Sequence, residues 1–283
     1  GIKELFLCLG FATPLSPTTL APNFKATMIM AIRIGVFADD IFGGFDMNYI
    51  TQYREIRSQY AKLIKIDSQD ITPIQKFTGV EITRDRAART GTITQTQYIE
   101  QLAELYKGQF TVHATPTRDS KAARDAFENL KPAAPGDKLV DQSAYLSLMG
   151  AMLWPATMTQ PHLCVYCAYL CSFMMKPTVS HYNAAIWLLG YLVHCKYMGI
   201  TYGGAVKVPL GVKKEDLPKD FFDTYGLHCY SDSSWGKAPK PMAGFILMLL
   251  NGAIDWSAKL LKVVADSTCE AETASASRAT KAV

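Results

Sequence analysis

The chain has 283 residues, 49% of them hydrophobic and 19% charged, and a formal net charge of +4 at pH 7. This composition excludes a disordered chain and allows one large or two ordinary folded domains. The charge is compatible with a polyanionic partner but is too small to indicate one. The seven cysteines are odd in number and scattered, which favours reduced thiols over a disulfide framework.

We expect no secretory leader, because the apolar residues after Gly1 lack a basic region and a cleavage site. Since the first residue is Gly1 rather than an initiating Met, we expect a fragment of a longer protein.

The stretch 28–44 contains two adjacent carboxylates, Asp39 and Asp40, between apolar runs. Apolar residues alternate from Ile32 to Val36, and Gly43-Gly44 follows the pair, so we predict a strand, a tight turn and a second strand. Adjacent carboxylates repel each other and are tolerated where water or a cation offsets them, and oxygen ligands suit Mg²⁺. The alternative is an ordinary polar turn.

The middle of the chain alternates between predicted helices, strands and a loop. Residues 47–66 have helical spacing, 75–82 and 91–95 are typical of strands, and 98–102 begins a helix. Residues 113–138, rich in Ala, Pro and charge, indicate a mobile loop whose basic residues could touch phosphates or simply be solvated: Arg118, Lys121 and Arg124.

The stretch 142–175 contains no Asp, Glu, Lys or Arg and is long enough to span a bilayer. Pro155 and Pro161 interrupt it, so buried helices are the favoured interpretation. Within it, three cysteines lie along one helical face: Cys164, Cys167 and Cys171. We expect core thiols rather than a metal cluster, because no fourth ligand lies at a suitable spacing.

The last third of the chain predicts three strands, at 227–235, 243–250 and 252–258, followed by a helix that begins near 267–272. The first strand contains Asp232, and the start of the helix contains Glu270 and Glu272. One Asp and one Glu carry no signal by themselves.

Several phrases resemble the reverse transcriptases of Ty1/copia-type retrotransposons. FADDI at 37–41 is similar to their Y-V-D-D-I box, with Phe37 in place of Tyr. KFTGVEI at 76–82 resembles the F-L-G-I-E-I strand of the primer grip, with Thr78 in place of Leu. HCYSDSSW at 228–235 resembles the strand that opens the RNase H domain, and STCEAE at 267–272 resembles the S-S-T-E-A-E phrase of its first helix.

The resemblance implies an α+β protein with three parts. Residues 1–92 would be the C-terminal part of a palm, 93–225 a mainly helical thumb and connection, and 226–283 the N-terminal part of a truncated RNase H-like domain. The parent would be an RNA-directed DNA polymerase with RNase H in a cytoplasmic virus-like particle or in the nucleus.

The resemblance also implies ligands and roles. Asp39, Asp40, Asp232 and Glu272 would be catalytic metal ligands for Mg²⁺ or Mn²⁺, with Glu270 as the other candidate on the helix. Nucleic acid would contact Phe37, Phe77 and Gly79. The partners would be an RNA template, a DNA primer, the RNA–DNA hybrid and dNTP, with no membrane.

Neither active site would be complete, because the family uses a further Asp from an earlier palm strand and another from a fourth RNase H strand. We therefore expect this chain alone to be inactive, and an open sheet edge to favour self-association. Two alternatives remain. One is a decayed or domesticated nucleic-acid-binding protein without catalysis, and the other is a helical membrane or scaffold protein.

Overall fold

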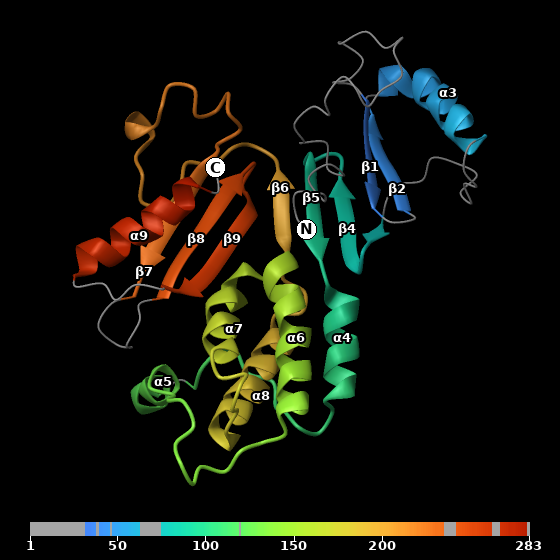
Figure 1. Ribbon diagram of the computed structural model, residues 1–283. Coiled ribbons are helices and arrows are strands. Elements are labelled where there is room, and N and C mark those ends of the chain that lie inside the picture. The colour runs from blue at the N-terminus through green and yellow to red at the C-terminus, as the bar shows by residue number, and fades with distance from the viewer. Residues whose placement is uncertain are drawn as a thin grey trace. The chain divides into compact units, whose positions relative to one another are not determined.

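The structure is a computed structural model (Figure 1), and it describes residues 32–37, 40–45, 47–62, 75–118, 120–234, 242–261 and 267–281. The chain divides into two compact units, 1–75 and 76–283. Helices and antiparallel sheets occur in both units, which is consistent with the predicted α+β class.

The first unit contains a pair of antiparallel strands and a helix. Strands β1 (Ile32–Phe37) and β2 (Asp40–Phe45) pair in a register that joins Ile32 to Phe45 and Phe37 to Asp40. The 3-10 turn η2 (Met47–Tyr49) leads into α3 (Ile50–Ala61). Both strands and the helix confirm the sequence predictions, although residues 63–66 of the predicted helix lie outside the described residues.

The second unit begins with a four-stranded sheet of β3 (Lys76–Phe77), β4 (Val80–Asp85), β5 (Thr90–Thr94) and β6 (Ile200–Gly203), in that order. The prediction of one strand over 75–82 is wrong, because a tight turn divides it. Both turn residues have positive φ, 46° at Thr78 and 79° at Gly79, which is typical of a two-residue hairpin turn. The predicted boundary after residue 92 falls inside β5, since β6 completes this sheet from beyond the helices.

A layer of helices follows this sheet. It consists of α4 (Thr96–Leu105), α6 (Gln142–Met158), η3 (Pro161–Leu163) with α7 (Cys164–Cys171), and α8 (Val179–His194). Their apolar faces meet in one core, whose fully buried residues include Tyr145, Leu148, Met149, Leu188 and Leu189. None of the helices in the described part of the chain is both long and apolar enough to cross a membrane.

The sequence predicted a loop over residues 113–138. The structure shows instead that this stretch contains a helix, α5 (Lys121–Glu128). The ring of Phe127 packs against Tyr166 and Tyr169, with ring centroids 5.8 and 5.5 Å away. These contacts with α7 give a short helix the tertiary support that its sequence alone does not provide.

A reciprocal cap fixes the start of α8. The Thr178 side chain accepts a hydrogen bond from the main-chain N–H of His181, and His181 Nδ1 accepts one from the N–H of Thr178 at 3.0 Å. His181 Nε2 therefore carries the proton and donates to the Lys131 carbonyl. Burial lowers the pKa of His181, so the cap operates with neutral imidazole at pH 7.

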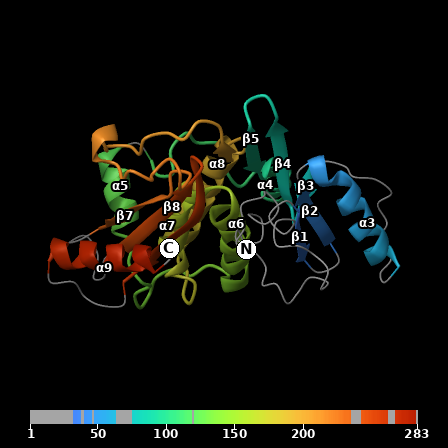
Figure 2. The same ribbon diagram turned by 90° about the horizontal axis from the view of Figure 1, so that it is seen from above.

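The C-terminal elements form a three-stranded antiparallel sheet, in the order β7 (His228–Ser233), β8 (Met242–Leu249) and β9 (Gly252–Leu260), followed by α9 (Thr268–Thr280). These elements confirm the predicted strand–strand–strand–helix order. The helix α9 lies along β7 and β8, whereas α7 lies against β9 (Figures 1 and 2). In the sequence, η4 (Lys214–Asp216) lies between β6 and β7.

Side-chain hydrogen bonds join the C-terminal sheet to the rest of this unit. Tyr202 of β6 is almost fully buried, and its hydroxyl donates to the Ala253 carbonyl of β9 at 2.6 Å. Trp256 of β9 donates from Nε1 to the Ala156 carbonyl of α6 at 2.7 Å. The two bonds tie β9 to the first sheet and to the helical layer, respectively.

Two helical glycines provide a matched test of this packing. An added Cβ at Gly150 in α6 would meet open space, but at Gly190 in α8 it would overlap the Thr111 carbonyl oxygen. We expect Gly150→Ala to raise the free energy of unfolding by about 0.5–1 kcal/mol through helix propensity, and Gly190→Ala to lower it. Urea denaturation of both variants measures the two signs, and equal effects would contradict the described docking of residue 111 on α8.

Candidate functional site

The predicted polymerase carboxylates are only partly covered by the structure. Asp39 lies outside the described residues. Asp40 is the first residue of β2 and pairs in the main chain with Phe37, the last residue of β1. Metal ligation by this pair stays a prediction.

The primer-grip-like residues lie at the β3–β4 turn of the second unit. Phe77 is only 7% exposed, and its ring belongs to the core. A Cβ on Gly79 would lie 3.9 Å from Nε1 of Trp154 on α6, so the turn is held near that helix. The surface that nucleic acid could reach here is the turn backbone rather than the Phe77 ring.

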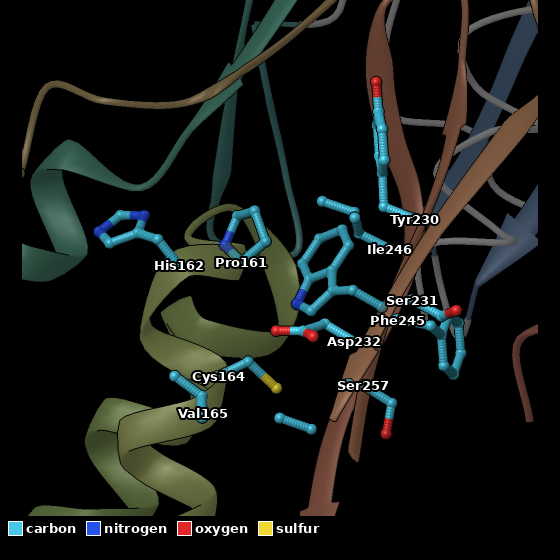
Figure 3. Close-up of a pocket in the computed structure, with 13 residues that line it drawn as sticks. Pro161, His162, Cys164, Val165, Tyr230, Ser231, Asp232, Phe245, Ile246 and Ser257 are labelled. Atoms are coloured by element: carbon cyan, nitrogen blue, oxygen red, sulfur yellow. The ribbon is translucent and has the colours of Figure 1, made fainter. Parts of the chain in front are cut away.

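Asp232, the predicted RNase H ligand on the first strand, occupies the middle of a row across the sheet. The register aligns it with Gly244 of β8 and Ala258 of β9. Its side chain is exposed and makes no hydrogen bond or ion pair with any residue that the structure describes. Figure 3 shows the carboxylate pointing from the sheet towards α7, on the same side as Tyr230 and Ile246.

A cleft of about 390 Å³ opens between this face of the sheet and the start of α7. Its walls are mostly apolar, and Asp232 contributes the only carboxylate among the described residues that line it, which include Pro161, Cys164, Val165, Ile246 and Trp256.

The opposite face of the sheet carries α9. Ser275 is buried, and its hydroxyl lies 2.8 Å from the Asp232 carbonyl and 2.9 Å from the Gly244 carbonyl. Arg278 contacts Ser257 Oγ at 3.3 Å. Because Ser257 points away from α7 in Figure 3, α9 packs on the face opposite the Asp232 carboxylate.

Glu272 and Glu270 are exposed residues of α9. The positions that face the sheet are Ala271, Ser275 and Ala279, all of them small and buried. The described structure therefore places the Asp232 carboxylate on one face of the sheet and the two glutamates on a helix that covers the other. It brings neither glutamate together with Asp232, and no group of three or more His, Cys, Asp or Glu residues within the described ranges is arranged to hold a metal.

The cysteines of α7 line its contacts with the core and the sheet. Burial raises the pKa of Cys167, which is fully buried, and raises the pKa of Cys171 to about 11. Burial also raises the pKa of Cys164. All three thiols are therefore protonated at neutral pH in the metal-free chain.

Two positioning residues were missed from the sequence, Ser275 and Trp256. The spacing of small residues at 271, 275 and 279 was the available signal for Ser275, because it allows a helix to approach a sheet closely. Trp256 lies inside a predicted strand, and nothing in the sequence indicates its hydrogen-bond partner on α6.

Several relatives of the chain are retrovirus-related Pol polyproteins of transposons. The chain is 26% identical over 208 residues to that of transposon TNT 1-94 from Nicotiana tabacum, covering 73% of this chain and 14% of the relative. It is 30% identical over 289 residues to that of transposon RE2 from Arabidopsis thaliana, covering 96% of this chain and 17% of the relative.

For one shorter relative, the alignment with this chain covers most of the relative's length. It is a protein attributed to transposon Ty5-1 in Saccharomyces cerevisiae, 26% identical over 261 residues, with 90% of this chain and 74% of the relative aligned. No family model matches the chain, and no solved structure matches it. This chain is a homologue of copia-type retrotransposon Pol polyproteins, and it spans about a sixth of the long ones.

Two serines of α9 test the docking of this helix on the sheet. Ser275→Ala removes the hydroxyl that bonds the carbonyls of β7 and β8, and we expect it to lower the free energy of unfolding by about 1 kcal/mol. Ser277→Ala is the matched control, because Ser277 is exposed on the same helix. It should leave stability unchanged or slightly raised. Thermal unfolding measures the stability of both variants. Equal losses of stability would argue against the packing of α9 on the sheet through the face that carries Ser275.

Proposed function

We propose that the chain is a segment of a copia-type Pol polyprotein that comprises the C-terminal part of the reverse transcriptase and the start of its RNase H region. The similarity to Pol polyproteins over most of the chain is the observation that carries the proposal. The order of elements supports it: a strand pair with Asp40, a second hairpin, packed helices, and a three-stranded sheet followed by a helix.

In the parent protein, Asp39 and Asp40 would help to hold Mg²⁺ or Mn²⁺. Adjacent carboxylate oxygens are the donor set that such a hard cation prefers. When bound, the metal stabilises the attacking and leaving oxygens of phosphoryl transfer. The substrates would be an RNA template, a DNA primer and dNTP, within a cytoplasmic virus-like particle or the nucleus.

The RNase H ligands fit such a metal less well in this chain. Asp232 points towards α7, and Glu272 lies on α9, which covers the opposite face of the sheet. One cation cannot be shared by two carboxylates held on opposite faces of a sheet, so we assign no step of hybrid cleavage to this pair. Because each candidate site is an incomplete ligand set, we propose that catalysis belongs to the parent protein.

We expect the purified chain to incorporate no nucleotides on a primed RNA template and to cleave no RNA–DNA hybrid, with Mg²⁺ or with Mn²⁺. The physical reason is that two-metal catalysis fails when part of the ligand set is missing. Primer extension and hybrid cleavage assays measure this directly. Metal-dependent extension that disappears in the Asp39→Asn/Asp40→Asn variant would show that the chain is catalytically complete.

A second candidate function is nucleic-acid binding without catalysis, and the β4–β5 hairpin favours it. Arg84, Arg86 and Arg89 are exposed at or beside its tip. They form no ion pair with any residue that the structure describes. Asp85, the nearest carboxylate in sequence, already accepts a hydrogen bond from Ala88 N–H within the turn. Three exposed guanidinium groups on one hairpin suit contacts with a phosphate backbone.

We expect the triple variant Arg84→Gln/Arg86→Gln/Arg89→Gln to weaken binding to an RNA–DNA hybrid and to reduce its salt dependence. Each lost phosphate contact should reduce the slope of log K against log salt by about 0.9. The matched control is Arg118→Gln/Lys121→Gln/Arg124→Gln, which removes the same charge near α5. Titrations at several salt concentrations compare the two, and equal losses would indicate general charge attraction rather than binding at the hairpin.

A further inference from the structure

The start of α4 is the point where the four-stranded sheet joins the helical layer. The chain passes from β5 into α4 through one residue, Gln95 (Figure 1). The first N–H groups of any α-helix lack partners within the helix, and the Gln95 side chain makes no capping hydrogen bond to them. Their partners therefore have to come from another part of the fold.

Glu81 of β4 provides these partners. Its Oε2 accepts hydrogen bonds from Thr96 N–H at 3.1 Å and from the Thr94 hydroxyl at 2.9 Å. Its Oε1 accepts a hydrogen bond from Gln97 N–H at 2.8 Å. The negative charge thus lies at the N-terminus of α4, where the helix dipole stabilises it. Together these hydrogen bonds form what we call the Glu81 clamp.

The strand register places the Glu81 clamp in a row across the sheet. Lys76 of β3 pairs with Glu81, and Glu81 pairs with Thr94 of β5. Neighbours in such a row point to the same face of a sheet. Accordingly, the ammonium group of Lys76 also reaches α4 and donates to the Gln97 side chain at 2.9 Å. Side chains from three strands therefore meet at the first turn of one helix.

Other contacts fasten the same turn to the helical layer. The Thr159 hydroxyl, at the end of α6, donates to the Gln95 side-chain oxygen at 2.9 Å, and both residues are buried. Thr96 Oγ1 donates to the Lys196 carbonyl, just beyond α8, at 3.1 Å. The apolar face of α4 belongs to the core of this layer. The helix is thus fixed to its neighbouring helices, and the Glu81 carboxylate connects it to the β4–β5 hairpin.

We propose that Glu81 is a positioning residue for nucleic-acid binding, which couples the β4–β5 hairpin to the helical layer. The inference rests on the proposed binding of nucleic acid by the arginines of this hairpin. The two strands pair continuously from Glu81–Thr94 to Asp85–Thr90, beside the tip. A ligand that restrains the tip therefore also restrains Glu81 and, through its carboxylate, the start of α4. This role requires no contact between the Glu81 side chain and the nucleic acid.

Hydrogen–deuterium exchange of single amides in the whole chain tests the Glu81 clamp without any ligand. Glu81→Gln keeps the shape of the side chain, but it removes the charge and one of the two acceptor oxygens. We expect the amides of Thr96 and Gln97 to exchange about tenfold faster or more, since hydrogen bonds to a charged group are among the stronger ones. The matched control is Glu104→Gln, which removes the same charge from an exposed site on α4, where Glu104 pairs with Lys107. It should leave the exchange of both amides unchanged.

Thr94→Val is a second variant that keeps the charge in place. It removes the hydroxyl that orients the Glu81 carboxylate, and it should accelerate the same exchange by a smaller factor. Circular dichroism confirms that each variant keeps the fold. Equal exchange at Thr96 and Gln97 in the wild-type chain and in Glu81→Gln would overturn the proposal.

An RNA–DNA hybrid, added as the probe, tests the coupling. In the wild-type chain it should slow exchange at the hairpin tip, residues 86–89, and also at Thr96 and Gln97. In Glu81→Gln it should still slow exchange at the tip but no longer at the start of α4, which a merely structural role of Glu81 would not produce.

Two further results would count against parts of this interpretation. Slowing at both places in Glu81→Gln would overturn the coupling through Glu81. A hybrid that slows exchange nowhere in the wild-type chain would refute the proposed nucleic-acid binding, and the positioning role with it. The Glu81 clamp itself would still be decided by the exchange measured in the free chain.

Discussion

Two hydrogen bonds made by buried or half-buried aromatic side chains determine how the C-terminal sheet is oriented relative to the first sheet and to the helical layer. Tyr202 reaches from the first sheet to the Ala253 carbonyl, and Trp256 reaches from β9 to the Ala156 carbonyl of α6. Gly252 leaves room for the Tyr202 ring, because an added Cβ there would overlap it. These contacts fix which face of the sheet meets α7 and leave the other for α9. The orientation of Asp232 follows from them, since alternation along β7 assigns its side chain to the α7 face.

For function, what matters is whether the acidic residues lie close enough together to bind one metal ion, rather than which acidic residues are present. Homology to Pol polyproteins is what the comparisons show, and metal-assisted phosphoryl transfer by the parent protein is our proposal. In the described structure, however, the Asp232 carboxylate points towards α7, whereas Glu272 belongs to α9, which packs on the opposite face of the sheet. Asp40 belongs to the other compact unit. Carboxylates that are distributed in this way can take part in catalysis only if further segments bring more ligands or shift those present. The proposed phosphate contacts of the exposed arginines in the β4–β5 hairpin would require no such completion.

The helices and strands could be predicted from local sequence patterns, whereas the neighbours that each of their faces packs against could not. Alternation identified β1, and phrases in order identified the three C-terminal strands and α9, because a strand or helix is a short-range pattern. The turn at Thr78-Gly79 was missed, since a β-branched residue with positive φ is unusual and Thr78 gives no turn signal. The helix α5 was missed because its support comes from Tyr166 and Tyr169, about 40 residues away. The faces on which Asp232 and Glu272 lie also depend on contacts between residues that are distant in the sequence. The order of elements along the chain therefore could not predict them.

The most direct test is a crystal structure of the chain grown with Mn²⁺. The anomalous scattering of Mn²⁺ would show where the ion binds. We predict the Asp232 carboxylate in the cleft beside α7, Ser275 bonded to the carbonyls of β7 and β8, and no Mn²⁺ shared between Asp232 and Glu272. A single Mn²⁺ coordinated by both carboxylates would contradict it. That result would show that β7 and α9 present their acids to the same side, and that the RNase H half-site is already formed in this chain.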